Sequence, residues 1–227
     1  MKFNFNSEFS RDKGVLLFIC LRNEPLHKYL TNLDKKNRNY IKQAMKVVNF
    51  NYKANNKLDL ILPKGSKADR IILLGVDKNK SFSDLELGKL GSNITSLLNS
   101  KKIKEVSLVL NDKTFNANEI ALVLYGIALN TYRFNKYFSN KKKMRENYIE
   151  TINLFSTNYK NIKNEWKRFN AIKEGVFLTR NLVSEPSNNL TPFLLSQEAL
   201  KLRKTGLKVE QLDEKKLKQL KMGALLG

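Results

Sequence analysis

The sequence has little of the chemistry that builds disulfide-stapled domains or simple metal sites. It contains one cysteine and one histidine among 227 residues. A single thiol excludes a disulfide within one chain, and Cys20 lies in the apolar run of residues 15–20, which predicts a buried strand thiol. His27 follows Pro25 in a polar stretch, and a lone histidine is more often a surface residue than a metal ligand.

Long apolar runs and targeting signals are also missing. The longest runs, residues 15–21 and 120–129, are far shorter than the roughly 20 residues that cross a bilayer. Residues 1–11 lack the basic start, apolar centre and small-residue cleavage site of a secretory signal. We therefore expect a cytoplasmic, globular protein with no membrane partner.

Motifs that carry catalysis are absent from the sequence. It has no His-Glu-x-x-His, Cys-x-x-Cys, nucleophile elbow or phosphate-binding loop. Gly88 and Gly91 lie within a helical pattern, which favours helix packing over phosphate binding. The acidic residues at 84–86 and 213–214 stand at expected helix starts, where negative charge favours the helix dipole. The residues themselves thus assign no catalytic or metal-ligating side chain.

Acidic residues are half as numerous as basic ones, with 21 against 42, and the net charge of +21 invites a nucleic-acid partner. Lys141, Lys142, Lys143 and Arg145 are the densest part of a basic stretch over residues 136–173 and are the candidate contact residues. Aromatic residues interleave with this stretch, as they do in surfaces that bind single strands.

A second interpretation of the basic stretch stays open. Trp166 and Phe169 stand at helical spacing from Ile172 and Val176, which is typical of a core with a solvated outer face. Lysine and asparagine are abundant along the whole chain, with 33 and 28 residues against 9 arginines. Such an excess also fits an AT-rich coding bias.

The first half of the chain alternates expected strands and helices, which indicates an α/β domain. We expect strands at residues 15–21, 58–62, 70–76 and 105–110, with a further strand possible within 148–155. Helices are expected over residues 33–46 and 87–98, the second opened by a capping box of Ser83 and Glu86. Asn118 is expected to cap a long helix that follows.

The pattern changes around residues 155–165, where we place a domain boundary. A helix is expected from Glu165 to a stop before Pro186, and another after the Thr191 cap, over residues 193–202. Residues 208–212 are then expected to form a strand and residues 214–222 a short helix.

Residues 70–76, 128–137, 180–192 and 207–227 are four blocks of sequence that resemble leucyl aminopeptidases. Residues 70–76 resemble a strand of the family's first region, and residues 128–137 carry a Tyr-Arg-Phe-x-x-Tyr signature. Residues 180–192 resemble the segment that opens the family's catalytic domain, and residues 207–227 continue the likeness in the same order and spacing. Asn181, Ser184 and Phe193 depart from the usual residues, at structural positions.

The resemblance implies a macro-like α/β domain over residues 1–155, with a mixed sheet flanked by helices. Residues 156–227 would then be a linker helix and the truncated start of an α/β/α metallopeptidase domain. In the complete family enzyme, two divalent metals, manganese or zinc, hold a water that attacks the first peptide bond. The N-terminal domain contributes to hexamer assembly.

The family's metal ligands are a lysine and several acidic residues in two glycine-rich motifs, and neither motif occurs between Met1 and Gly227. The resemblance therefore implies no catalytic residue, metal ligand or cofactor within this chain, which we expect to be inactive alone. Apolar side chains such as Val176, Phe177 and Leu182 would be left exposed and prone to aggregation. The alternative is a non-catalytic binding module for hexamer assembly or DNA contact.

Overall fold

A computed structural model describes residues 1–7, 13–22, 24–54, 56–77, 81–139 and 146–226. The chain divides into two compact units, Met1–Gly175 and Val176–Gly227. Each unit is described by itself below.

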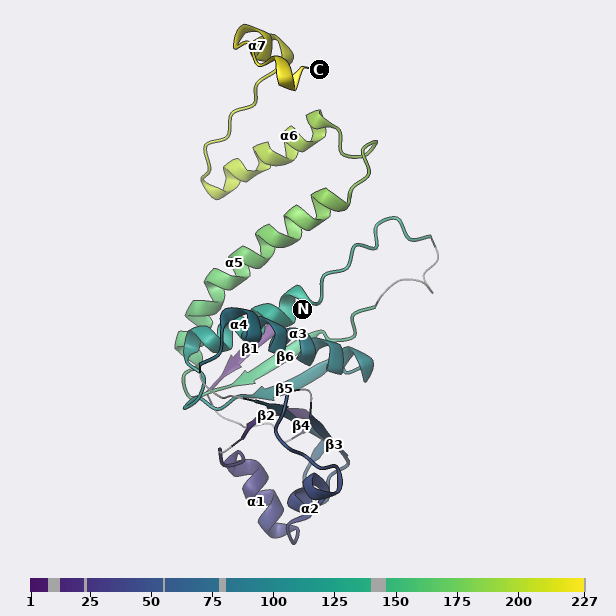
Figure 1. Ribbon diagram of the computed structural model, residues 1–227, viewed down its shortest axis with the longest axis vertical. Coiled ribbons are helices and arrows are strands. Elements are labelled where there is room, and N and C mark those ends of the chain that lie inside the picture. The colour runs from purple at the N-terminus through teal and green to yellow at the C-terminus, as the bar shows by residue number, and fades with distance from the viewer. Residues whose placement is uncertain (8–12, 23, 55, 78–80, 140–145, 227) are drawn as a thin grey trace. The chain divides into compact units, whose positions relative to one another are not determined.

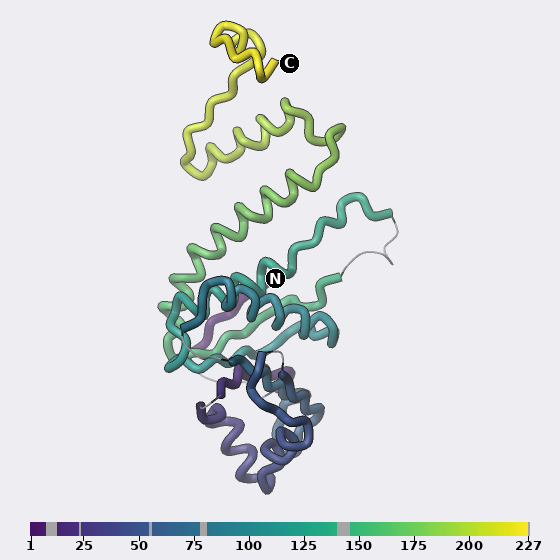
Figure 2. Tube along the Cα trace, in the orientation of Figure 1, coloured from purple at the N-terminus to yellow at the C-terminus, as the bar shows by residue number. Residues whose placement is uncertain are grey.

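The first unit is built on a six-stranded mixed sheet with the order β1-β6-β5-β2-β4-β3. Only the β3–β4 pair is antiparallel, and the other neighbours run parallel. Figure 2 shows that β1, at the start of the chain, lies beside β6 although about 150 residues separate them in sequence. The strands are β1 (Lys2–Asn6), β2 (Gly14–Leu21), β3 (Lys57–Ile61), β4 (Ala68–Val76), β5 (Glu105–Val109) and β6 (Thr151–Phe155).

Helices cover both faces of this sheet (Figure 1). α3 (Asp84–Ser100) and α4 (Ala117–Leu129) lie on one face, and α1 (Lys28–Lys36) and α2 (Tyr40–Val47) on the other. β2 is buried on both faces because it is central in the sheet: Leu17 joins the core under α3 and α4, whereas Leu16 and Phe18 join the core under α1 and α2. The predicted α/β fold with helices flanking a mixed sheet is confirmed.

α3 and α4 approach each other closely at glycines. A Cβ on Gly91 would lie 2.1 Å from the carbonyl oxygen of Val123, and one on Gly126 would lie 2.2 Å from that of Gly88. Thr95 Oγ1 donates a hydrogen bond across this contact to the Ile127 carbonyl at 3.0 Å. The helix-packing interpretation of Gly88 and Gly91 is therefore confirmed.

The four strands predicted first are present with small differences at their ends, and the predicted capping box opens α3. Ser83 Oγ accepts from the Glu86 amide at 3.4 Å, and Glu86 Oε2 accepts from the Ser83 amide at 2.8 Å. Cys20 is 5% exposed, as predicted for a strand thiol.

The single helix predicted over residues 33–46 is wrong, since the chain forms α1 and α2 instead. Arg38 and Asn39 between them have φ of 53° and 58°, a left-handed conformation that ends a helix. Asp34, 1% exposed, caps the second helix, with its Oδ1 accepting from the Ile41 amide at 2.7 Å. The apolar period runs across this turn, which is why the pattern looked continuous.

One further prediction about the first unit is wrong, and one of its strands was not predicted. α4 is capped by Asn116, not Asn118: Asn116 Oδ1 accepts from the Glu119 amide at 3.0 Å, while Glu119 Oε2 accepts from the Asn116 amide at 2.8 Å. Asn118 Oδ1 instead accepts from Arg168 at 3.1 Å. Strand β1 was not predicted, although its alternation of Phe and Asn is typical of a strand.

The remaining helices are α5 (Tyr159–Ser184), α6 (Pro192–Lys201) and α7 (Glu214–Gln219), with the short 3-10 turns η2 (Leu202–Thr205) and η3 (Gly223–Leu225). α5 begins earlier than the predicted Glu165 and ends before Pro186 as predicted. Thr191 Oγ1 caps α6 by accepting from the Leu194 amide at 3.3 Å, also as predicted. The strand predicted over residues 208–212 is wrong: this segment is irregular and pairs with no strand among the described residues.

Candidate functional site

Among the described residues, no group of three or more His, Cys, Asp or Glu side chains is placed to hold a metal ion. His27 stands at the start of α1, where its Nδ1 accepts from the Tyr29 amide at 3.2 Å. Burial lowers the pKa of His27, and the nearby Asp112 carboxylate opposes this shift in part. His27 therefore serves as a helix cap, and burial favours the neutral imidazole whose Nδ1 can accept this hydrogen bond.

A cleft of about 800 Å³ opens where the parallel strands β2, β5 and β6 end. Its wall includes Glu24 and Asn111 from the segments that follow β2 and β5, and Thr157 from the segment after β6. Ligands of open α/β sheets bind outside the carboxyl ends of the strands, so this is the position that the fold favours for a small-molecule site.

Hydrogen bonds fix the carboxylates of this cleft. Glu24 accepts from Asn111 Nδ2 at 2.7 Å and also from the Thr114 hydroxyl. Asp112 Oδ2 accepts from the Thr157 amide at 2.8 Å and from its hydroxyl at 2.7 Å. Asp112 Oδ1 is buried and accepts no hydrogen bond from the described residues.

The sequence analysis did not single out Glu24 and Asp112. The signal that could have found them is their position, because each comes soon after a predicted strand, at residues 15–21 and 105–110. Parallel strands bring such residues to one edge of the sheet.

The candidate nucleic-acid contacts Lys141, Lys142, Lys143 and Arg145 lie outside the described residues. Of the aromatic residues interleaved with the basic stretch, Phe155, Trp166 and Phe169 are 5%, 9% and 6% exposed. Trp166 packs on Phe3 with ring centroids 4.5 Å apart. These aromatic side chains belong to the core, as the second interpretation predicted.

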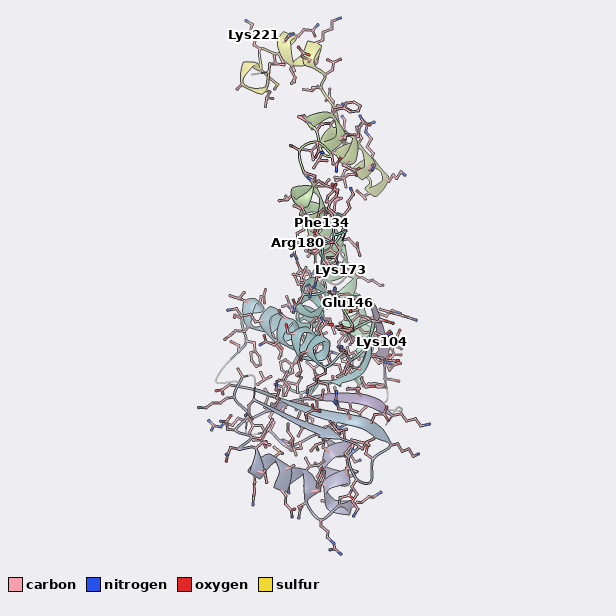
Figure 3. All side chains as sticks on the ribbon, turned by 90° about the vertical axis from the view of Figure 1, so that its right-hand side faces the viewer. Lys104, Phe134, Glu146, Lys173, Arg180 and Lys221 are labelled. Carbon is pink, nitrogen blue, oxygen red and sulfur yellow. The ribbon has the colours of Figure 1, made fainter. Side chains whose placement is uncertain are left out.

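In the second unit, Val176–Gly227, none of the described residues is buried. Figure 3 shows the side chains around Lys221 projecting from short helices. Val176, Phe177 and Leu182, which we expected to be exposed, are partly buried. Larger apolar exposure occurs at Val183, Phe193, Leu194, Leu195, Leu207, Leu220, Met222, Leu225 and Leu226.

No helix among the described residues is long and apolar enough to cross a membrane.

The sequence of this chain is similar to those of known proteins. Residues 15–141 match the family model described as "Cytosol aminopeptidase family, N-terminal domain". A "Probable cytosol aminopeptidase" from Rhodopseudomonas palustris is 34% identical over 191 residues, which is 82% of this chain and 38% of that protein. One from Sinorhizobium fredii is 31% identical over 234 aligned positions, covering 100% of this chain and 46% of that protein.

A mutant of tomato leucine aminopeptidase has the same fold, with a TM-score of 0.76 and 22% sequence identity. That match covers 97% of this chain and 46% of the tomato chain. The chain spans less than half the length of each of these proteins. Since the family model matches more than half of its residues, the chain belongs to the cytosol aminopeptidase family.

Proposed function

We propose that this chain is the N-terminal part of a leucyl-type metallo-aminopeptidase, which removes N-terminal amino acids from peptides. The observation that carries the proposal is the family match over residues 15–141, joined to sequence similarity that continues through the whole chain. Residues 1–155 would be the macro-like domain. Residues 156–227 would be the linker helix and the opening of the α/β/α catalytic domain.

The exposed apolar side chains of the second unit support this assignment. An isolated unit stabilised by its own core would bury apolar side chains, yet none of the described residues from Val176 onward is buried. Phe193 and Val183 are 63% and 81% exposed. Exposed apolar side chains at this density mark a surface that another part of a protein covers. In a member of this family, the rest of the catalytic domain would cover this surface.

The complete enzyme would hold two divalent metals, manganese or zinc, in that remainder, and would assemble as a hexamer in the cytoplasm. The chain itself supplies the sheet domain and the connecting helix. We therefore expect no turnover of leucine p-nitroanilide by residues 1–227 alone, with or without manganese.

A chimera tests the proposal directly. Residues 1–227 would replace the matching 46% of the Sinorhizobium fredii relative, and hydrolysis of leucine p-nitroanilide would be measured with manganese. We expect activity that dialysis against a chelator abolishes and added manganese restores. The unmodified relative is the control. A folded chimera that binds manganese but shows no activity would contradict the proposal, as would turnover by residues 1–227 alone.

A second function, contact with DNA, is favoured by the net charge of +21. We propose Lys141, Lys142, Lys143 and Arg145 as the contact. Duplex affinity should fall steeply between low and moderate salt, because each neutralised phosphate releases counterions. Replacing the four residues with Gln should flatten that dependence, whereas Lys215→Gln with Lys216→Gln should not. Equal effects of the two sets of substitutions on the salt dependence would argue against this function.

A further inference from the structure

A groove of about 670 Å³ lies at the open edge of the sheet, and all the residues that line it belong to the first unit. β1 lines it through its consecutive residues Phe3–Asn6, and the first turns of α5 line it from the helix side. Asn153 and Phe155 of the neighbouring strand β6 complete the lining. No part of the proposed aminopeptidase function uses it. The α5 residues that line it are Tyr159, Lys163, Trp166 and Lys167.

The backbone of β1 has an unused edge in this groove. β1 is the outermost strand and pairs only with β6 among the described residues. The Lys2 amide donates to the Glu150 carbonyl at 2.7 Å, and the Asn6 carbonyl accepts from the Ser156 amide at 3.1 Å. Since backbone groups alternate in direction along a strand, Phe3 and Phe5 direct their N–H and C=O groups away from β6.

α5 runs beside this edge in the opposite direction to β1. β6 is parallel to β1, and α5 begins shortly after β6 ends, which places its first turn near the end of β1. Trp166, two turns later, packs on Phe3 near the start of β1, with ring centroids 4.5 Å apart. An extended chain laid along β1 would therefore lie along α5 as well.

The α5 wall is basic. Lys163 and Lys167 are exposed, lie one turn apart on the same face of the helix, and both line the groove. None of the residues lining the groove carries a carboxylate. Four residues of helix rise about 6 Å, and alternate side chains of a strand are about 6.6 Å apart. Two acidic side chains separated by one residue in an extended peptide thus match the spacing of the two lysines.

We propose that this groove binds an extended peptide segment with acidic side chains at alternating positions, which pairs with Phe3 and Phe5 as an additional strand. Backbone hydrogen bonds to an open edge supply affinity in this mode, and the side chains on one face supply specificity. A second copy of this chain fits less well, because its own β1 edge would bring the lysines of two α5 helices together.

Fluorescence anisotropy with a labelled Val-Glu-Val-Glu-Val-Glu-Val peptide measures the proposed binding on the full chain. The Lys163→Glu, Lys167→Glu double variant should bind about tenfold or more weakly, because two attractive pairs become repulsive. Lys215→Glu with Lys216→Glu makes the same charge change at exposed positions of α7 and should leave affinity unchanged. A peptide with Lys in place of Glu should not bind.

Amide hydrogen exchange distinguishes strand addition from general attraction to a basic protein. Binding should slow exchange at Phe3 and Phe5 at least about tenfold and leave Asn4 unchanged, because the Asn4 amide already faces β6. Equal weakening by the two charge-reversal variants, or no protection of Phe3 and Phe5, would overturn the proposal. So would protection that grows with protein concentration without peptide, which would assign the edge to a second copy.

Discussion

Cys20 lies on central strand β2 and is 5% exposed. Burial raises the pKa of its thiol from the ordinary 9.0 to about 12, because an apolar surrounding disfavours the thiolate. The thiolate is the form that attacks disulfides and alkylating agents. We therefore expect native protein at pH 8 to react negligibly with a disulfide reagent, whereas protein unfolded in guanidinium releases one equivalent at once. Rapid reaction of native protein, with no change in its circular dichroism, would contradict this.

The same shift sets a dependence of stability on pH. A thiol whose pKa is higher in the folded state favours folding below its ordinary pKa, and this contribution disappears as pH rises from 9.0 through about 12. The free energy of unfolding of the Cys20→Ala variant should fall less over this range than that of the natural chain. Urea titrations at pH 8, 9 and 10 measure the difference, and parallel curves for the two proteins would exclude a role for Cys20.

Ser83 caps α3, and this contact can be tested through the pKa of Glu86 as well as through the stability of the protein. Glu86 has a lowered pKa because it accepts hydrogen bonds from the Ser83 backbone and side chain. Ser83→Ala removes the side-chain bonds, should cost about 1 kcal/mol of stability, and should raise the Glu86 pKa toward its ordinary value. A carboxylate whose pKa is lowered by folding stabilises the folded state above its ordinary pKa, and this contribution is lost as pH falls. The variant should therefore lose less stability than the natural chain between pH 6 and 3. Carboxyl NMR titration checks the shift, and an unchanged Glu86 pKa would contradict the assignment.

At the scale of elements, the close crossing of α3 and α4 depends on one glycine more than on its neighbour. A Cβ on Gly91 would meet the backbone of Val123 and Ile127 at 2.1 and 2.6 Å, whereas one on Gly88 would meet nothing within 4 Å. Gly91→Ala should therefore cost about 2–3 kcal/mol through forced separation of the helices. Gly88→Ala should stabilise by about 0.5–1 kcal/mol, because alanine is the better helix former. Urea unfolding measures both, and effects of the same sign would show that the crossing is looser than described.

The sequence predictions are accurate where a feature is determined by residues close in sequence, and less accurate where it depends on remote residues. The Ser83 and Thr191 caps depend on neighbours within three residues, so the sequence predicted them correctly. The break between α1 and α2 depends on Asp34 turning inward to cap the next helix, which an apolar period does not show. Residues 208–212 alternate as a strand does, but a strand needs a partner, and none is described beside them. The converse holds for β1, whose partner β6 is remote in sequence.

The functional surfaces were predicted less well because they are products of topology. Glu24 and Asp112 reach one cleft only because β2 and β5 are parallel neighbours. Family membership, in contrast, came from contiguous motifs and needed no three-dimensional information. The sequence therefore identified the family without indicating this cleft.

At the scale of the whole molecule, the division into two units predicts that the first unit keeps its stability when the second is removed. The last buried side chain among the described residues is Phe169, which joins Ile162 and Trp166 in the core under α3 and α4. A chain ending at Gly175 retains all three. It should unfold at the same urea concentration as residues 1–227, and it should bind less of a dye specific for exposed apolar surface.

A chain ending at Phe155 is the matched comparison, and it also tests the domain boundary predicted after residue 155. It lacks Ile162, Trp166 and Phe169, whose removal exposes the apolar faces of β1 and α4 that they cover. Truncating one such side chain costs about 3–5 kcal/mol, and a small domain has only about 5–15 kcal/mol of stability in total. We therefore expect this shorter chain to be unfolded or molten by near-ultraviolet circular dichroism. Folding as stable as that of the chain ending at Gly175 would contradict this expectation, because the macro-like domain of residues 1–155 would then not need the side chains of the linker helix α5.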